Sequence, residues 1–426
     1  MPTGRIMARL GRSRPTGLRA AAPVALLAAA AMAVAGLLAS CAREKATWRQ
    51  PLTLRNVPTI RVRLTAPPVG AAEISSTAGY RLWVDGKLIS QSADAMPVAT
   101  MRHGGGRWSF NALSVEGSEA MLEPTGGFLR VGKTSYRGRL RLVADANQFT
   151  LINDVDLESY LAGVLSEELY PAWSPATYQA LAVAARTFAL YQMKTAGIGR
   201  DFDVGDDQAS QVYGGASAET DKSWRAVRAT HGQVLAYGPP GQERIFLAQY
   251  SACCGGVVNG AAVIRQSPDI PPLAGGQRCD DCRQCPKYRW GPVSIPKAEV
   301  YRAAAQAYPA VANLGSLATV KVASATVYGR PVWLDLVGPG GHSVRLRAED
   351  LRGALLHSGL PAAKQLYSMN CRIEDAGTAI EFADGKGFGH GVGLCQWGAQ
   401  GKAERGWQAN EILRFYYPES RVQAAY

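Results

Sequence analysis

The stretch DLESYLAGVLSEE, residues Asp156–Glu168, decides the fold of this chain. Plotted as a helix at about 100° per residue, it gathers its apolar side chains into one stripe, with Glu168 in line with the stripe's centre. Glu167 falls about 80° away, at the edge of the same face. A carboxyl held against a dry surface is disfavoured in its charged form and becomes a better proton donor near neutral pH. Glu168 is therefore a candidate functional carboxyl, and a solvated glutamate at a fraying helix end is the alternative. The stripe consists of Leu157, Tyr160, Leu161, Val164 and Leu165.

A second helix is expected soon after the first. Ser174 is a suitable N-cap and Pro175 suits the first helical position. The two helices should pack as a hairpin with Glu168 at its mouth. Arg186 lies at the margin of the second helix's apolar face, where it either reaches polar groups at that mouth or extends along the surface.

The first 40 residues have the pattern of a signal peptide. Basic residues precede the apolar run Ala20–Leu38, and Leu38-Ala39-Ser40-Cys41 resembles a bacterial lipobox, in which the cysteine is lipidated. A transmembrane anchor is the alternative. We expect an exported protein that is attached to the cell envelope only through lipid on Cys41. The lipid would insert into either the inner or the outer membrane.

The charge of the chain excludes some partners. The segment before Cys41 has five arginines and no acidic residue, so removing it lowers the formal charge from +12 to +7. A moderately basic exported protein suits an anionic envelope polymer, and the charge is too diffuse to indicate nucleic-acid binding.

Beyond the signal peptide the pattern predicts an α+β fold. Residues 41–66 form a tether and a first strand, and residues 67–150 alternate between apolar and polar positions as antiparallel strands do. Residues 151–426 form the core, which combines the helical hairpin with a mixed α/β C-terminal part. That core contains a Cys-rich loop, 253–285, and a Gly-rich loop, 385–399.

The Cys-rich loop has the spacing of a structural metal site. Cys279, Cys282 and Cys285 are separated by two-residue gaps, which allow neighbouring sulfurs to converge on one ion. With Cys253 or Cys254 they would complete a four-sulfur zinc site, and Cys254 with the other three is the predicted set. Disulfides between loop and turn are the alternative in an oxidising compartment, and either role is structural.

In the Gly-rich loop five glycines, at positions 385, 387, 389, 391 and 393, surround one histidine. They leave His390, Gln396 and Trp397 as the large groups able to contact a ligand. The Lys-Ser/Thr pair of a phosphate-binding loop is missing. An aromatic ring beside amide and imidazole donors suits a sugar. A histidine bonded within a tight turn is the alternative for His390, and it is the expectation for the remaining four, His103, His231, His342 and His357.

From about residue 128 to residue 420 the chain resembles the SpoIID/LytB-domain family, with several motifs in one order. The motifs are residues 136–138, 153–164, 182–190, 211–215, 217–220, 389–399 and 411–418. Members of the SpoIID type are lytic transglycosylases that cut peptidoglycan glycan strands and prefer strands without stem peptides. The resemblance implies that Glu168 is the catalytic residue, with Glu167 as its rival. Substrate-binding roles are implied for Arg186, Tyr213, His390, Gln396 and Trp397.

This chain departs from the family pattern at two places. Leu169 and Tyr170 follow Glu168, where the family usually has methionine and proline. Some members bind zinc through a histidine and cysteines, but Ser251 occupies the histidine position here. A fourth ligand must then come from elsewhere, or the metal is absent.

The implied chemistry needs only one carboxyl and no cofactor. A glycoside hydrolase uses a second carboxylate as nucleophile or as base for water. A lytic transglycosylase lets the muramic acid's own 6-hydroxyl attack the anomeric carbon, so one glutamate serves as acid and then as base. The alternative implied by the family is a non-catalytic LytB-like protein, either an enhancer of a wall amidase or a peptidoglycan-binding lipoprotein.

Overall fold

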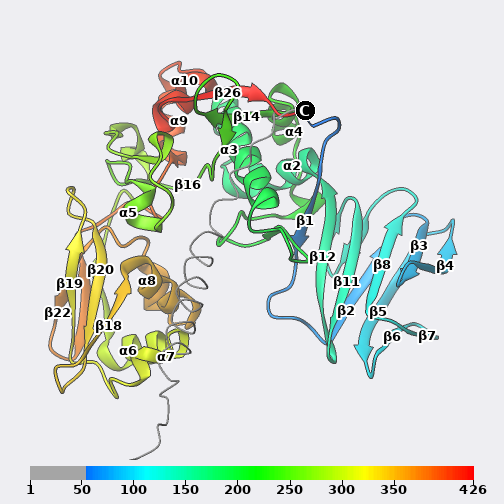
Figure 1. The fold of residues 1–426 in the computed structure, drawn as a ribbon, viewed down its shortest axis with the longest axis horizontal. Helices are drawn as coiled ribbons and strands as arrows, with labels where there is room; N and C mark the ends of the chain where they lie inside the picture. Colours follow the sequence, from blue (N-terminus) through cyan, green and yellow to red (C-terminus); the bar gives the residue numbers. More distant parts are fainter. Residues whose placement is uncertain (1–53) are drawn as a thin grey trace, which may run out of the picture. The chain divides into compact units, whose positions relative to one another are not determined.

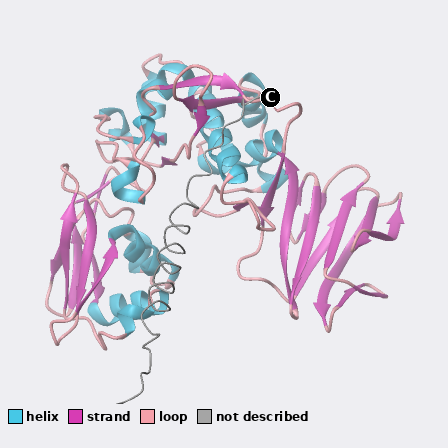
Figure 2. Cartoon of the chain, viewed as in Figure 1, coloured by secondary structure: helices cyan, strands magenta, loops and turns pink. Residues whose placement is uncertain are grey.

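The structure, a computed structural model, describes residues 54–426 and has an α+β fold. The predicted signal peptide and Cys41 lie outside the described residues. Within residues 54–426, no helix combines the length and the apolar composition that crossing a bilayer requires. Figures 1 and 2 show the elements in sequence order and by type.

The N-terminal part consists of two antiparallel-rich sheets that share one hydrophobic core, as the alternating pattern predicts (Figure 1). The first has the order β13-β1-β12-β11-β8-β3-β4. Its strands are β1 (Thr59–Arg63), β3 (Tyr80–Val84), β4 (Lys87–Ser92), β8 (Glu119–Pro124), β11 (Arg139–Asp145), β12 (Gln148–Asp156) and β13 (Val204–Gly205). The second has the order β10-β9-β2-β5-β6-β7. Its strands are β2 (Ala71–Ser76), β5 (Met96–Gly104), β6 (Arg107–Phe110), β7 (Leu113–Glu116), β9 (Leu129–Val131) and β10 (Thr134–Tyr136).

Strand β12 connects the sheet to the helical hairpin. It crosses residue 150, where the sequence placed a segment boundary, and runs on to Asp156, which pairs with Thr59 of β1. The Asp156 carboxylate then accepts a hydrogen bond of 2.9 Å from the Ser159 N–H. Because an N-cap satisfies a backbone donor that the first turn leaves free, this contact fixes where α2 begins.

The predicted helical hairpin is confirmed. Helix α2 is Leu157–Glu168, and α3 is Pro175–Lys194 with Ser174 as its N-cap. Both pack against α4 (Asp221–Ala229), and α3 also contacts α9 (Gln396–Glu404) and α10 (Ala409–Tyr416). A small sheet, β15-β14-β26, lies beside α3. Its strands are β14 (Gln233–Tyr237), β15 (Arg244–Ile245) and β26 (Ser420–Ala424).

Residues 289–386, here termed the insert lobe, stand between the Cys-rich and Gly-rich loops and have their own hydrophobic core. The antiparallel pair β17 (Arg289–Trp290) and β24 (Gly385–Lys386) joins the two ends of the lobe. The sequence pattern did not separate this lobe from the core. Its other elements are β18 (Val293–Pro296), α6 (Lys297–Ala307), α7 (Pro309–Ala312), β19 (Thr319–Ala325), β20 (Pro331–Val337), β21 (Ser343–Arg347), α8 (Ala348–His357), β22 (Arg372–Asp375) and β23 (Ala379–Ala383).

A short parallel pair brings the two loops of interest together. Strand β16 (Tyr250–Ser251) pairs with β25 (Leu394–Cys395), with Ser251 opposite Cys395. The turn that follows β16 carries Cys253 and Cys254, and α9 begins directly after β25. Helix α5 (Ala261–Arg265) follows the turn. The β16–β25 pairing therefore places part of the Cys-rich loop beside the Gly-rich loop.

Candidate active site

A cavity of about 740 Å³ lies at the C-terminal end of α2. It is lined by that helix end, the turn leading to α3, strand β16, the Gly-rich loop and helix α8 of the insert lobe. Five of the sequence-predicted residues line it, namely Glu167, Glu168, His390, Gln396 and Trp397. The helical hairpin and the Gly-rich loop, far apart in sequence, thus meet at one cavity.

The carboxyl group of Glu168 is held from two sides. Its Oε1 accepts a hydrogen bond of 3.1 Å from the Val212 N–H, and its Oε2 accepts one of 2.9 Å from Nε2 of Gln396. The same Gln396 nitrogen donates to the Glu168 carbonyl at 3.2 Å. Each carboxyl oxygen retains a second lone pair, so a proton can still be carried toward the cavity. Glu167, by contrast, is exposed.

The surroundings of Glu168 raise its pKa above the ordinary glutamate value of 4.5. Burial is the largest cause, because it penalises the charged carboxylate. Hydrogen bonds from Gln396 and Val212 act in the opposite direction, since they stabilise the carboxylate. The negative charge of Glu167 adds to the increase in pKa. A carboxyl in this setting keeps its proton to higher pH than a solvated glutamate does.

Three aromatic rings form one wall of the cavity. The ring centroid of Trp397 lies 5.0 Å from that of Trp173 and 5.6 Å from that of Tyr170. Tyr170 is 56% exposed, so the wall presents open aromatic surface. The proline that the family usually has at this position could not contribute such a ring. The departure at Leu169-Tyr170 therefore extends the aromatic surface beside Glu168.

His390 is a neutral hydrogen-bond donor. Burial and the positive charge of Arg265 lower the pKa of His390 to about 3. Its Nδ1 lies 3.1 Å from the Val392 nitrogen and accepts that N–H. The ring proton must then reside on Nε2, because a neutral imidazole carries one proton. His390 is therefore hydrogen-bonded within a tight turn, which was the alternative expectation from the sequence, and it also lines the cavity.

The structure places Arg186 away from the cavity lining. Its side chain is fully buried and forms a two-pronged ion pair with Glu158, with Nε–Oε1 at 2.8 Å and Nη2–Oε2 at 2.7 Å. Nη1 donates to the Gln233 carbonyl at 3.0 Å. The guanidinium therefore holds α2, α3 and β14 together. The sequence predicted either a cavity residue or a surface arginine at this position, and both predictions are wrong, because Arg186 forms a buried structural ion pair.

Tyr213 is likewise a packing residue and not part of the cavity lining. Its hydroxyl donates to Asn153 Oδ1 at 2.9 Å, and its ring lies 4.9 Å from that of Tyr160. A Cβ at Gly163 would stand 2.8 Å from the Tyr213 ring, so only glycine fits there. Tyr213 fixes the backbone next to Val212, whose N–H meets Glu168.

The insert lobe contributes charged groups that sequence reasoning missed. Glu349 and Arg352 on α8 line the cavity, and Arg330 pairs with Glu349 at 2.6 Å. Arg330 also donates to the Gly389 carbonyl at 3.0 Å, which ties the lobe to the Gly-rich loop. Burial raises the pKa of Glu349, but Arg330 and Arg352 outweigh it and leave that pKa below the ordinary value. Glu349 is therefore an ionised, engaged carboxylate.

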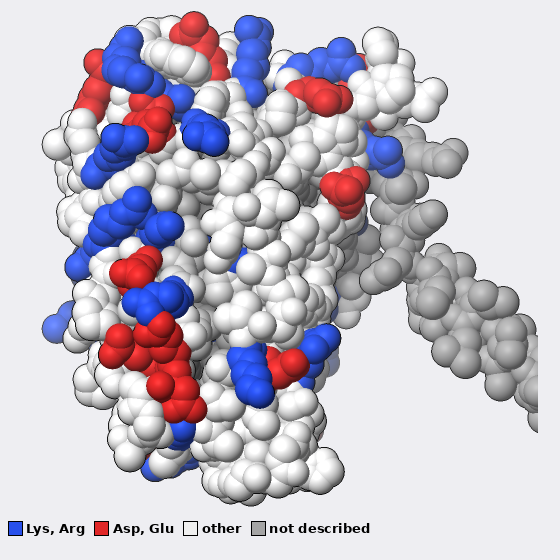
Figure 3. Space-filling model, turned by 90° about the vertical axis from the view of Figure 1, so that its left-hand side faces the viewer, with Lys and Arg blue, Asp and Glu red and all other residues white. Residues whose placement is uncertain are grey.

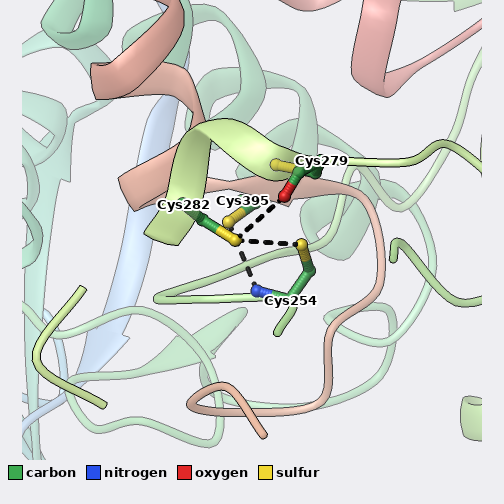
Figure 4. Close-up of side chains that lie close together, drawn as sticks. All are labelled: Cys254, Cys279, Cys282 and Cys395. Carbon is green, nitrogen blue, oxygen red and sulfur yellow. Dashed lines mark hydrogen bonds between the residues drawn. The ribbon is translucent and has the colours of Figure 1, made fainter. Parts of the chain in front are cut away.

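Four buried thiols from the Cys-rich loop and the Gly-rich loop converge in the structure. The sulfurs of Cys254, Cys279, Cys282 and Cys395 all lie within 4.8 Å of one another (Figure 4). The cluster differs from the predicted set in one member, since Cys395 of the Gly-rich loop occupies the place expected for Cys285. The seven cysteines of residues 54–426 are free thiols. Four convergent, buried thiols fit the ligand set of a closed zinc site.

The face drawn in Figure 3 carries charges of both signs. On the face drawn in Figure 3, Lys and Arg side chains are interspersed with Asp and Glu. On this face the basic side chains do not form the long basic stripe that is typical of nucleic-acid-binding proteins.

Comparisons with known proteins point to one family. Residues 145–237 match the family described as stage II sporulation protein, SpoIID. An uncharacterized protein of Brachyspira hyodysenteriae is 28% identical over 307 residues, which are 72% of this chain and 77% of that protein. The stage II sporulation protein D of Bacillus subtilis is 28% identical over 289 residues, covering 64% of this chain and 76% of its own length. The amidase enhancer of Bacillus subtilis is 25% identical over 300 residues, covering 61% and 39%.

The matched segment 145–237 contains the helical hairpin, Glu168 and Val212, which are the elements that build the site. The two relatives named first match 72% and 64% of this chain. Together, the matched family model and these relatives support a SpoIID/LytB family assignment.

Proposed function

We propose that this protein acts on the cell wall as a lytic transglycosylase that cuts peptidoglycan glycan strands, with stem-peptide-free strands as its substrate. The observation that carries the proposal is the Glu168 carboxyl, which faces a 740 Å³ cavity and has a raised pKa. The test is the release of products with 1,6-anhydromuramic ends from such strands.

The reaction would proceed through one carboxyl in two roles. Protonated Glu168 donates its proton to the glycosidic oxygen as the bond from that oxygen to the anomeric carbon breaks. The resulting carboxylate then takes the proton of the muramic 6-hydroxyl, and O6 bonds to the anomeric carbon. Glu168 ends protonated, as it began. Because the nucleophile belongs to the substrate, holding the sugar in place substitutes for a second carboxylate, and the chemistry needs no cofactor.

The remaining cavity residues suit the holding of a sugar. Trp397 and Tyr170 offer aromatic faces, the Nε2–H of His390 offers a donor, and Gln396 orients the carboxyl. Glu349 is a poor candidate for a second catalytic base, because Arg330 and Arg352 lower its pKa and occupy its oxygens.

The pH dependence should report the raised pKa of Glu168. The acid role needs the protonated form, so kcat/KM is expected to fall as pH rises through that pKa, with a midpoint above 4.5. Gln396→Leu removes a donor that stabilises the carboxylate and should move this alkaline limb upward by about one to two pH units, since such a bond contributes about 1.5–3 kcal/mol. Gln192→Leu, also in the cavity lining, should leave the midpoint in place. A Gln396→Leu profile with an unchanged midpoint would refute the role given to Gln396.

The aromatic wall should act in binding. Trp397→Ala is expected to raise KM for glycan by about tenfold, a loss of about 1.4 kcal/mol, with a smaller effect on kcat, because a stacking face contacts substrate and transition state alike. Trp407→Ala is the control, since Trp407 packs on Lys402 and Phe415. Steady-state kinetics on soluble glycan oligomers measure both, and equal KM values would contradict the assignment.

A second candidate function is that of a non-catalytic amidase enhancer or a peptidoglycan-binding lipoprotein. It is favoured by the likeness to a protein named amidase enhancer, of which this chain matches 39%. Adding a purified wall amidase to the glycan assay separates the cases: an enhancer raises amidase turnover without producing anhydro ends, and a passive binder changes neither. In either case we propose export and lipid attachment at Cys41, a residue outside the described part.

A further inference from the structure

We infer that Arg352, assisted by Arg265, binds the free lactyl carboxylate that a muramic acid residue exposes when it carries no stem peptide. Both arginines line the cavity that contains Glu168. The inference deepens the proposed function and rests on it, because it takes stem-peptide-free glycan as the ligand. It assigns the choice between stripped and peptide-bearing strands to these two side chains.

The lactyl carboxylate is a chemical mark of a stripped strand. The lactyl group is attached to O3 of the muramic ring, the same ring whose anomeric carbon would react. A stem peptide converts this carboxylate into an amide, which carries no charge and continues into a peptide. Without the peptide, the group presents one anionic carboxylate, which accepts hydrogen bonds and donates none. A cationic side chain that pairs with it would therefore select stripped strands.

Arg352 is placed to serve as that cationic donor. It lies on α8 three residues after Glu349, so both side chains project from one face of the helix, and both line the cavity. Its Nε donates to the Leu366 carbonyl at 2.8 Å, which fixes the guanidinium. Nη1 stands 3.9 Å from Glu349 Oε2, too far for a hydrogen bond, and among residues 54–426 no acceptor lies within hydrogen-bonding distance of Nη2. The two Nη groups can therefore bind a carboxylate through parallel N–H bonds.

The charges around Arg352 favour an added anion. The negative charge of Glu349 is balanced by Arg330, whose Nη2 lies 2.6 Å from Glu349 Oε1. Arg265, the last residue of α5, is exposed and forms no ion pair with any other residue in the range 54–426. Burial lowers the pKa of Arg352, Arg330 adds to the decrease, and Glu349 opposes it. Since the guanidinium stays charged at neutral pH, a carboxylate bound here would offset the excess of positive charge.

The Gly-rich loop connects this charged region to Glu168. At one end of the loop, Gln396 donates to Glu168 Oε2 at 2.9 Å. At the other end, the Gly389 carbonyl accepts a hydrogen bond of 3.0 Å from Arg330. The cavity of about 740 Å³ lies within the range of about 300–1,000 Å³ that is typical of small-molecule sites. A bound glycan can thus present its glycosidic bond to Glu168 and its lactyl carboxylate to Arg352 within one cavity.

The first test measures binding, so that it does not depend on cleavage. Three tetrasaccharides of alternating N-acetylglucosamine and N-acetylmuramic acid, with free lactyl carboxylates, lactyl methylamides or stem peptides, are titrated calorimetrically into the full chain carrying Glu168→Gln. The free form should bind about 10- to 100-fold more tightly than the methylamide form, the range expected of a charge-assisted hydrogen bond. Equal affinities, or no binding of any form, would overturn the inference. Binding of the stem-peptide form as tight as that of the free form would also overturn it, because the carboxylate recognised would then belong to the peptide.

Three variants in the same background test the arginines. Arg352→Gln should reduce the affinity ratio of the free to the methylamide form to near one. Arg265→Gln should reduce it by less than about fivefold, because exposed ion pairs are weak. Arg347→Gln is the control, since Arg347 stands at the start of α8, pairs with Asp350 at 2.7 Å and lies outside the cavity lining, so the ratio should stay.

A ratio that survives Arg352→Gln contradicts the assignment. Should Arg352→Gln not fold, Arg352→Lys takes its place, because lysine keeps the charge but lacks the planar pair of donors. This variant should lose part of the preference, and an unchanged ratio would again contradict the assignment.

Activity of the wild-type chain separates this inference from the proposed function. Release of anhydro products is measured on stem-peptide-free glycan before and after conversion of its lactyl carboxylates to methylamides. Cleavage of both with the same kcat/KM would uphold the transglycosylase and overturn the role of the carboxylate. Cleavage of neither, with the affinity ratio intact, would uphold carboxylate binding by Arg352 and refute the catalytic proposal.

Discussion

Replacing Glu168 by glutamine is expected to lower the rate of anhydro-product release by about 10²- to 10⁴-fold, the usual contribution of general acid–base catalysis. Glutamine keeps nearly the same size, but it cannot give a proton to the glycosidic oxygen or take one from the 6-hydroxyl. Single-turnover assays on stem-peptide-free glycan measure the effect. Glycan binding should persist, since the variant leaves the aromatic wall of Trp397 and Tyr170 intact.

Glu167→Gln is the matched control for that variant. Glu167 lies next in sequence and lines the same cavity, yet its side chain is exposed and its place at the helix edge gives it no dry surroundings. Its substitution should change the rate by less than about tenfold. If Glu167→Gln abolished turnover and Glu168→Gln did not, Glu167 would be the acid and the assignment would be wrong.

Replacing Arg186 by methionine is expected to destabilise the fold by about 3–5 kcal/mol, because it leaves a buried carboxylate without its partner. Glu158 is 5% exposed, and the side chain of Arg186 is fully buried. Neither side chain can move to water without opening the contact of α2 with α3. Urea unfolding followed by far-UV circular dichroism gives the change in free energy.

Arg107→Met provides the comparison, because Arg107 forms an ion pair of similar length, 2.7 Å, with Glu116 on the surface. Exposed pairs contribute about 0–1 kcal/mol, so this variant should unfold close to wild type. The double variant Glu158→Gln with Arg186→Met should recover part of the loss by removing the stranded charge. A loss below about 1 kcal/mol for Arg186→Met would show that the ion pair does not hold the hairpin.

Capping residues and hydrophobic periodicity predicted the helical hairpin and the position of Glu168. The start of α3 is determined by the N-cap Ser174 and by Pro175. The buried side of α2 is determined by the apolar stripe of residues 157–165. Both signals act within a few residues of sequence. Glu168 was predicted as the candidate carboxyl because it lies in line with the centre of the same stripe.

Long-range packing decided what the sequence could not. Cys285 was included in the thiol set because it follows Cys282 at the same spacing, whereas Cys395 joins the cluster through the pairing of β25 with β16. The insert lobe brings Glu349 to the cavity in the same way, and no local pattern marks that approach. Arg186 did carry a usable signal: an arginine among alanines on a buried helix requires a carboxylate, and Glu158 stands at the start of the neighbouring helix.

The most direct test of the central claim is the product formed from stem-peptide-free glycan in water enriched in oxygen-18, analysed by mass spectrometry. If the muramic 6-hydroxyl is the nucleophile, new ends carry a 1,6-anhydro bond and contain no oxygen from water. Products with reducing ends that contain oxygen-18 would show that water is the nucleophile, and the account in which Glu168 acts with the muramic 6-hydroxyl would then be wrong.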